Sequence, residues 1–480
     1  MPINSFLYPG AKVTPAYEVA NSCRFNDGDS AYLNKSNGTA TNTDKFTFSA
    51  WVKRSGITLG QTAMIFGEHS GDSTGKTEFG FRTDDTLWFY QEDSTTGNIH
   101  IQTNRKFRDP AAWMHLCLAV DTSQGVAANR VKLYVNGTQE TSFSTATYPS
   151  ADLNTRFNGT SLPLYIGYFG SGSAKYFDGY MAEVVMVDGS QLAPTSFGEF
   201  DEDSPQIFKP INVSGLTFGT NGFYLDFEDS SNLGNDANGG TDWTENNLAA
   251  ADQATDTPTN SFCTMNPLDN YYPASTFSEG NNYIVSGSSP YSSNTATMGV
   301  SSGKWYYELK YVARGGSDDL VHVGIKSKQD TANTQELGHH STDYGYRAYN
   351  GQVRNNDSDA SHGNTFAVND IIGVYIDLDN NKLYFAKNGT VQNSGTGVSI
   401  TAAASTDFGF YFPAISWNDG STTGTMALNF GGSPAFSISS GNADANGYGS
   451  FEYDPSSGTF DGSSKDFLAI CTKNLGSDGG

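Results

Sequence analysis

The sequence predicts an all-β protein made of two tandem antiparallel β-sandwiches. Two stretches carry this prediction, residues 119–138 and 369–390, in which apolar and polar residues alternate at period two. Both apolar runs stop at an Asn-Gly dipeptide, which tolerates the positive φ angles of a hairpin turn. No long stretch has the apolar spacing of a helix, and Gly, Ser, Thr and Asn fill the gaps between apolar runs. Two copies of one hairpin pattern, far apart in the chain, indicate two sandwiches.

Length and charge limit the class of protein. A chain of 480 residues exceeds one ordinary core, so two or three domains are expected. The net charge of −24 argues against nucleic acid and against an anionic membrane as partners. No apolar run reaches the length of a membrane span, so we expect no membrane insertion. The N-terminus, MPINSFLYPGAK, lacks the basic and apolar regions of a signal peptide, which predicts synthesis in a cytoplasm without export.

The four cysteines are scattered and show no CxxC or CxH spacing. The two that lie in or beside apolar runs, Cys117 and Cys471, are most simply buried thiols. The pattern therefore predicts neither a zinc site nor a disulfide framework. The complete set is Cys23, Cys117, Cys263 and Cys471.

The first predicted sandwich occupies residues 21–200. Residues 1–20 precede it, either as a frayed leader or as an arm that docks on a neighbouring protein. Short strands bounded by Gly, Asp and Ser follow, as in a sandwich or jelly roll. The run WMHLCLAVD at 113–121 is apolar throughout, which predicts a central strand buried on both faces.

The order of these strands resembles a known family. The segments FTFSAWVKR, WMHLCLAVD, NRVKLYVNG, LYIG and FDGYMAEVVMVDG stand in the order seen in laminin-G-like, concanavalin A-like jelly rolls. The opening RFNDGDSAYL is similar to the first strand of that family and the turn after it. The resemblance implies a jelly roll over this part of the chain.

The remainder divides into three parts. Residues 201–284 form a connector that is rich in Asp, Asn and Gly but too aromatic for a flexible tether, so it should pack on one or both sandwiches. Residues 285–435 resemble a SPRY domain through GKWYYE, VGI, YGY, DIIGVYIDLDNNKLYFAKNG, FPAIS and LNFG in that order. Residues 436–480 form a C-terminal extension with one apolar strand at 467–471.

No catalytic constellation is convincing, so the sequence predicts that the protein is not an enzyme. Glycanases on the concanavalin A-like fold carry alternating carboxylates on one strand, often as E-x-D-x-E. The nearest match is LDFED, where Asp226 and Glu228 share a parity but a third carboxylate is missing. The adjacent pair His339-His340 is interpreted as part of a loop rather than as a metal site.

Binding residues are predicted at loop edges, where aromatic faces can stack on sugar rings and polar side chains can bond the hydroxyl groups. The alternative for each aromatic residue is a place in the core. The ligand-binding candidates are Trp88, Tyr90, Tyr168, Phe169, Tyr349, Asn350, Trp417 and Asn418.

Calcium is the most plausible ion, because its oxygen ligands can come from loop Asp and Asn residues. The resemblance to jelly-roll lectins implies a calcium site near strand ends, with Asp27, Asp29 and Asp178 as ligands. The alternative is that these residues are ordinary solvated turn residues.

A laminin-G-like jelly roll followed by a SPRY domain, behind a leader such as MPINSFLYPGAK, resembles virion proteins of tailed bacteriophages. This resemblance implies a non-enzymatic virion protein, such as a tail fibre or surface appendage, that contacts other virion proteins and host cell-surface glycans. Weak single sites need many copies, so a homo-oligomer, with a trimer favoured, is expected. The alternatives are a capsid or tail decoration protein that binds no glycan, and a polysaccharide depolymerase.

Overall fold

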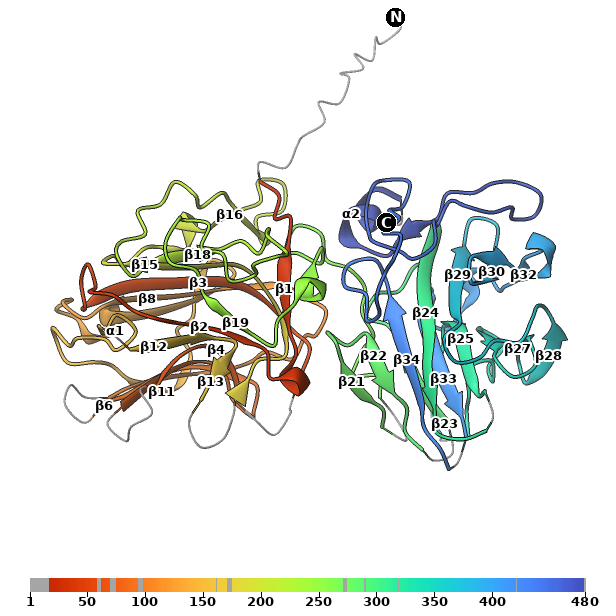
Figure 1. Ribbon diagram of the computed structural model, residues 1–480, viewed down its shortest axis with the longest axis horizontal. Helices are drawn as coiled ribbons and strands as arrows, with labels where there is room; N and C mark the ends of the chain where they lie inside the picture. Colours follow the sequence, from red (N-terminus) through yellow and green to blue (C-terminus); the bar gives the residue numbers. More distant parts are fainter. Residues whose placement is uncertain are drawn as a thin grey trace, which may run out of the picture.

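The computed structural model shows two β-sandwiches side by side, with the first half of the chain in one and the second half in the other (Figure 1). The prediction of two tandem antiparallel sandwiches is confirmed. The structure describes residues 17–57, 62–69, 75–93, 98–160, 162–170, 175–270, 274–288, 291–317, 319–330, 332, 334–419 and 421–478. The interpretation of residues 1–20 falls mostly outside this set. No helix among the described residues has the length and apolar character needed to cross a membrane.

Two eight-stranded sheets form the first sandwich. One, which we call the covered sheet, has the spatial order β10 (Thr138–Gln139), β9 (Val131–Val135), β8 (Met114–Asp121), β3 (Lys45–Arg54), β15 (Gly179–Asp188), β1 (Ser22–Phe25) and β20 (Gln253–Ala254), with β18 (Phe223–Leu225) paired to β15. The other, which we call the open sheet, has the order β11 (Phe143–Thr147), β7 (Ile99–Lys106), β6 (Thr86–Asp93), β5 (Gly75–Phe81), β4 (Ala63–His69), β12 (Pro163–Ile166), β2 (Tyr32–Ser36) and β19 (Thr244–Asn246).

Phenylalanine rings from both sheets make the core between them. In β3 the alternate residues Phe46, Phe48, Ala50 and Val52 point into this core, as their spacing predicts. Phe48 stacks on Phe66 of β4 with ring centroids 4.7 Å apart. The interior is therefore filled by side chains at one parity of each strand.

The connector covers the outer face of the covered sheet, which gives that sheet its name. Val213 and Phe218 of the connector, with Phe197 just before it, pack on Cys117 of β8 and Val185 of β15. The strand at 113–121 is consequently buried on both faces, as its composition predicts. Strands β18, β19 and β20 of the connector also pair with the first sandwich. All four cysteines are buried free thiols.

The second sandwich has a nine-stranded and a six-stranded sheet. The nine-stranded sheet has the order β21 (Thr276–Ser278), β22 (Tyr283–Val285), β34 (Gly424–Asn429), β24 (Lys304–Arg314), β29 (Ile371–Asp377), β30 (Lys382–Lys387) and β31 (Thr390–Val391), with β32 (Val398–Ser399) on β30 and β35 (Leu468–Ala469) on β24. The six-stranded sheet has the order β23 (Tyr291–Thr295), β33 (Phe412–Asn418), β25 (Val321–Lys326), β26 (Asp343–Arg347), β27 (Gln352–Asn355) and β28 (Ser358–Ser361).

Short elements complete the fold. They are the hairpin strands β13 (Tyr168–Phe169), β14 (Lys175–Tyr176), β16 (Gly198–Phe200) and β17 (Phe208–Pro210), the helices α1 (Ala127–Arg130) and α2 (Thr472–Asp478), and the 3-10 turns Asp27–Asp29, Pro194–Ser196, Ala250–Asp252, Asn393–Gly395 and Ala403–Ser405.

The C-terminal extension packs on the outer face of the nine-stranded sheet. Phe451, Phe460 and Phe467 lie against Tyr306 of β24 and Tyr375 of β29. The predicted strand at 467–471 is present as β35, which pairs with β24 in parallel. The extension is thus part of the second sandwich's structure.

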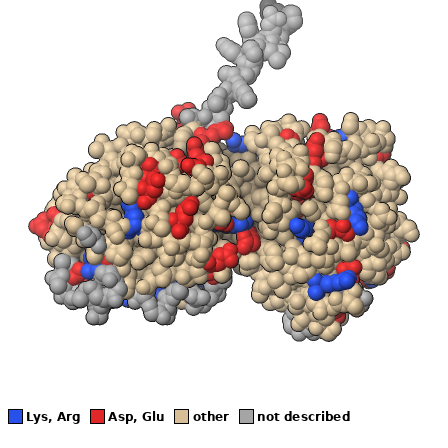
Figure 2. All heavy atoms as spheres, viewed as in Figure 1, with Lys and Arg blue, Asp and Glu red and all other residues tan. Residues whose placement is uncertain are grey.

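Buried polar contacts join the two sandwiches through the connector. Lys53 of β3 pairs with Asp256 at 2.7 Å, and both side chains are 1% exposed. The Lys53 ammonium also donates to the carbonyl of Phe262, whose ring packs with the C-terminal extension. Arg24 of β1 reaches across to the Ser433 hydroxyl and the Pro434 carbonyl. Acidic side chains are dispersed over both sandwiches on the face shown in Figure 2.

Candidate functional site

The open sheet presents aromatic side chains on its outer face. Its strands alternate, so that Leu87 and Phe89 of β6 enter the core while Trp88 and Tyr90 face outward. Of the described chain, the short hairpin of β13 and β14 packs on this face, against β4. This contrasts with the covered sheet, whose outer face is buried under the connector.

One aromatic group is built on β6 and β7. The rings of Trp88 and Tyr90 stack with centroids 5.2 Å apart and an interplanar angle of 12°. The guanidinium of Arg82 lies 4.5 Å from the Trp88 ring, and His100 meets Tyr90 edge-on at 5.4 Å. Trp88 is only 8% exposed, whereas Tyr90 is half-buried. Trp88 therefore supports Tyr90, which offers ring surface to a ligand.

A second group is a stack of tyrosines on the hairpin and the neighbouring strands. Tyr168 lies between Tyr32 of β2 and Tyr176 of β14, at 4.6 Å and 4.7 Å respectively. Tyr165 of β12 meets Tyr168 edge-on at 5.3 Å. All four tyrosines are half-buried, so their outer edges remain accessible. Phe169, by contrast, is 1% exposed and serves as packing under the hairpin.

Lys175 of β14 connects these two groups. Its ammonium donates to both carboxylate oxygens of Glu78 on β5, at 2.9 Å and 3.0 Å, and lies 5.8 Å from the Trp88 ring. Glu78 is fully buried, so this ion pair fixes the hairpin on the sheet.

The hydroxyls of Tyr90 and Tyr168 are hydrogen-bond donors at neutral pH. Burial raises the pKa of Tyr90, and Glu92 raises it further. Burial and the neighbouring Tyr176 raise the pKa of Tyr168. Both phenols therefore keep their protons.

We call the outward side chains of this surface the aromatic face: Tyr32, Trp88, Tyr90, His100, Tyr165, Tyr168, Lys175 and Tyr176.

Sequence reasoning found part of this face. It named Trp88, Tyr90 and Tyr168 and missed the others, while Phe169, which it also named, is buried under the hairpin. Tyr32 and Tyr165 alternate with core leucines, so their parity was a usable signal. Lys175 and Tyr176 join this face only because β14 folds back onto the sheet.

The candidates in the second sandwich do not form one site. Trp417 is fully buried against Tyr311 and donates its Nε1–H to the Thr422 carbonyl at 3.0 Å, so its prediction as a sugar platform is corrected. Its position in β33 points into the core because of strand alternation. Asn418, the next residue, donates to Glu336.

Tyr349 is the accessible aromatic candidate of the second sandwich. Its ring is 43% exposed and lies 4.7 Å from the guanidinium of Arg347. The side-chain amide nitrogen of the neighbouring Asn350 donates to Gln352 Oε1, and its amide oxygen accepts from the Gln352 backbone N–H. Tyr349 follows β26, which β25 separates from β33 and the buried Trp417.

The acidic residues proposed for calcium occupy one corner of the first sandwich. Asp27 and Asp29 lie in a 3-10 turn, and Asp178 is buried before β15. Burial raises the pKa of Asp178 to about 8, with Asp27 and Glu279 adding to the shift. The three carboxylates are not grouped within 4.8 Å of one another, so as arranged they do not fit a calcium site.

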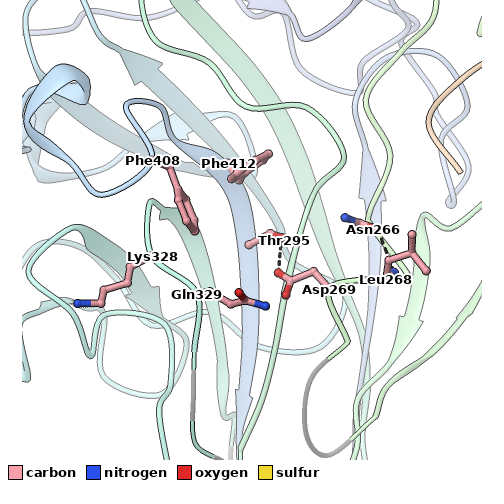
Figure 3. A pocket seen from close by; sticks show the side chains of 8 residues that line it. All are labelled: Asn266, Leu268, Asp269, Thr295, Lys328, Gln329, Phe408 and Phe412. Carbon is pink, nitrogen blue, oxygen red and sulfur yellow. Dashed lines mark hydrogen bonds between the residues drawn. The ribbon is translucent and has the colours of Figure 1, made fainter. Parts of the chain in front are cut away.

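A cleft of about 270 Å³ lies at one end of the second sandwich (Figure 3). Phe408 and Phe412 form its apolar wall, and Phe408 is 40% exposed. Asp269, which bonds to Thr295, supplies a polar side. Lys328 and Gln329, from the segment after β25, complete it. The lining comes from four segments that are distant in the sequence, which explains why the sequence did not reveal it.

Comparison with known proteins identifies two domains. Residues 27–193 match the family model described as concanavalin A-like lectin/glucanases superfamily. Residues 304–432 match the SPRY domain model.

Curated relatives share only part of the chain. A probable ATP-dependent RNA helicase ddx1 of Dictyostelium discoideum is 31% identical over 139 residues, which are 29% of this chain and 16% of that protein. The Set1 complex component ash2 of Schizosaccharomyces pombe is 33% identical over 102 residues, which are 21% of this chain and 15% of that protein. The chain therefore spans about a sixth of the length of these relatives.

Solved structures are similar over parts of the chain. The SPRY domain of human HERC1 has a TM-score of 0.29 and 17% identity, covering 34% of this chain and 96% of that one. A putative carbohydrate binding protein from Bacteroides ovatus has a TM-score of 0.33 and 18% identity, covering 48% and 59%. With the two family matches, the sequence and the fold agree that this chain carries a concanavalin A-like domain followed by a SPRY domain.

Proposed function

We propose that this protein is a non-enzymatic glycan-binding adhesion protein and that the aromatic face is its binding surface. One observation carries the proposal: the open sheet displays half-buried tyrosines on a face that the described residues of the connector leave uncovered, while the connector covers the opposite sheet. The C–H faces of a sugar ring stack on such rings, and hydroxyl groups pair with the phenols and Lys175. The match to a lectin/glucanase superfamily supports the same ligand class.

Glu78 behind this face and Asp226 beside the covered sheet are each engaged by neighbouring groups, which favours binding over hydrolysis. A glycosidase needs two carboxyl groups that flank the scissile bond. Both oxygens of the buried Glu78 are held by Lys175. Asp226 accepts a hydrogen bond from the backbone of Glu228 in the segment after β18, which belongs to the covered sheet.

We further propose that the protein is a component of the virion of a tailed bacteriophage. There it would be a tail fibre or surface appendage that contacts other virion proteins and host surface glycans. The support is the sequence resemblance in domain order and leader. Several copies, with a trimer favoured, would convert weak single sites into firm attachment.

The test is binding of the labelled full chain to a glycan panel and to intact bacterial cells, with and without EDTA. Saturable binding that a free sugar competes is expected. Tyr90→Ala and Tyr176→Ala should each weaken it about tenfold, or ~1.4 kcal/mol. Tyr349→Ala removes an exposed tyrosine from the other sandwich and should leave binding unchanged.

Each contrary outcome leads to a different conclusion. Absence of binding by the folded protein would overturn the adhesin proposal in favour of a decoration protein. Release of reducing ends from a bacterial polysaccharide would establish a depolymerase. Loss of binding in Tyr349→Ala alone would place the site on the second sandwich.

A further inference from the structure

A cluster of metal-binding side chains lies where β25 ends and β26 begins in the second sandwich. Asp330 and His340 belong to the connection between these strands, and Asp343 is the first residue of β26. Among the described residues, these three side chains each place one ligand atom within 4.8 Å of the ligand atoms of the other two.

Asp343 is buried without a hydrogen-bond partner. Its side chain is fully buried, and neither carboxylate oxygen accepts a hydrogen bond. The backbone N–H groups of Ser327 and His340 approach the carboxylate without reaching bonding geometry. A buried carboxyl group without partners is costly, so such an arrangement indicates a missing cation.

The other two residues offer free atoms to the same point. His340 Nε2 and Asp330 Oδ1 are 3.5 Å apart, and both are buried atoms without a hydrogen-bond partner. The Lys326 ammonium bonds to the other Asp330 oxygen, Oδ2, and to the Ser293 hydroxyl. Lys326 therefore occupies Oδ2 of Asp330 and leaves Oδ1 available.

We propose that Asp330, His340 and Asp343 bind a divalent transition-metal ion, with Zn²⁺ as the ion that fits best. One imidazole nitrogen and two carboxylate oxygens form a mixed donor set that suits zinc. Calcium requires six to eight oxygen ligands and does not favour imidazole. Three protein ligands leave a fourth tetrahedral position for water or another ligand.

The ion would anchor the segment that forms one side of the cleft in Figure 3. Lys328 and Gln329 line that cleft and lie between Lys326 and Asp330. The Ser327 hydroxyl oxygen lies 2.6 Å from the Thr406 hydroxyl and 2.6 Å from the Phe410 carbonyl, within hydrogen-bond distance of both, and so joins this segment to the aromatic side. Zinc binding thus holds the cleft wall in place.

The experiment uses the full chain stripped with a chelator and dialysed against Zn²⁺. Metal content by mass spectrometry and competition with a chromogenic zinc chelator give stoichiometry and affinity. We expect one zinc ion per chain and a higher thermal midpoint in its presence. His340→Gln and Asp343→Asn should each lower the affinity at least tenfold.

His339→Gln is the matched control. His339 is adjacent in sequence, but its ring is paired with Asp357 on the surface, so this variant should bind zinc as the wild type does. Asp343→Asn changes a buried residue and could prevent folding. The thermal midpoint of this variant without zinc therefore shows whether it folds. If Asp343→Asn does not fold, the affinity of His340→Gln for zinc alone decides whether the proposal holds. Wild-type protein without stoichiometric zinc, or equal affinity in His340→Gln, would overturn the proposal.

Discussion

Several carboxylic acids are buried deeply enough to hold their protons near neutral pH. Burial raises the pKa of Asp178 to about 8 and that of Glu183 and Glu308 to about 7. In the unfolded chain these groups ionise near pH 4. Between pH 4 and 8 the folded state binds more protons than the unfolded state, so the stability that these groups contribute falls as pH rises through this window.

Asp178→Asn tests this sign at one residue. Asparagine cannot ionise, so the variant should be more stable than the wild type at pH 8 and should lose this advantage at pH 5. Denaturant unfolding at the two pH values measures the difference. Asp84→Asn is the control, because hydrogen bonds from Thr86 lower the pKa of Asp84 and removing its charge should bring no gain at pH 8. An advantage of Asp178→Asn that is the same at both pH values would contradict the assignment.

At the scale of elements, the two Asn-Gly dipeptides close hairpins in the way their sequence predicts. Asn388 and Gly389 have φ angles of 47° and 77°, and Asn136 and Gly137 have 47° and 73°. Two successive positive φ angles characterise the tight turn whose twist matches the flanking strands. Gly389 is further constrained, since an added Cβ would lie 2.7 Å from the Tyr453 ring.

Gly389→Ala should therefore destabilise the protein through both strain and overlap, by about 2 kcal/mol. Gly462→Ala isolates the strain, because Gly462 has a φ of 84° but no atom within 4 Å of an added Cβ. That variant should lose only about 1 kcal/mol. Denaturant unfolding of both variants measures the two contributions, and equal losses would show that the Tyr453 contact costs nothing.

For the whole molecule, we expect the connector to make the two sandwiches unfold as one cooperative unit, because buried polar contacts join them. Asp256 is the connector's central residue: it pairs with Lys53 and accepts a hydrogen bond from the Trp113 indole at 2.8 Å. These groups lie between the sandwiches, where water does not compensate for a lost partner. Removing one member of a buried ion pair leaves an uncompensated charge.

Asp256→Ala should cost about 3–5 kcal/mol and separate the thermal unfolding of the sandwiches into two transitions. Differential scanning calorimetry follows both effects, and the wild type should show one transition. Asp319→Ala breaks a more exposed pair with Arg314 and should cost at most about 1 kcal/mol. A wild-type protein with two transitions, unchanged in Asp256→Ala, would show that the sandwiches unfold independently.

The amino-acid sequence by itself determined the fold class and the two-sandwich organisation. Period-two alternation, as in β3, specifies which residues of a strand share a face. Asn-Gly specifies a turn through the φ angles that its residues tolerate. Both are local properties of the backbone, so they can be inferred without knowing the neighbours. The same parity placed Trp88 and Tyr90 together on one face.

The tertiary structure alone decided which of these faces is free. Trp417 and Tyr90 lie in similar alternating strands, yet one is buried and the other is accessible, because parity does not state which side another segment covers. The zinc cluster shows the same limit. The sequence indicated a loop at His340, whereas its neighbours Asp330 and Asp343 lie on either side of it in the chain and converge only when β25 and β26 pair.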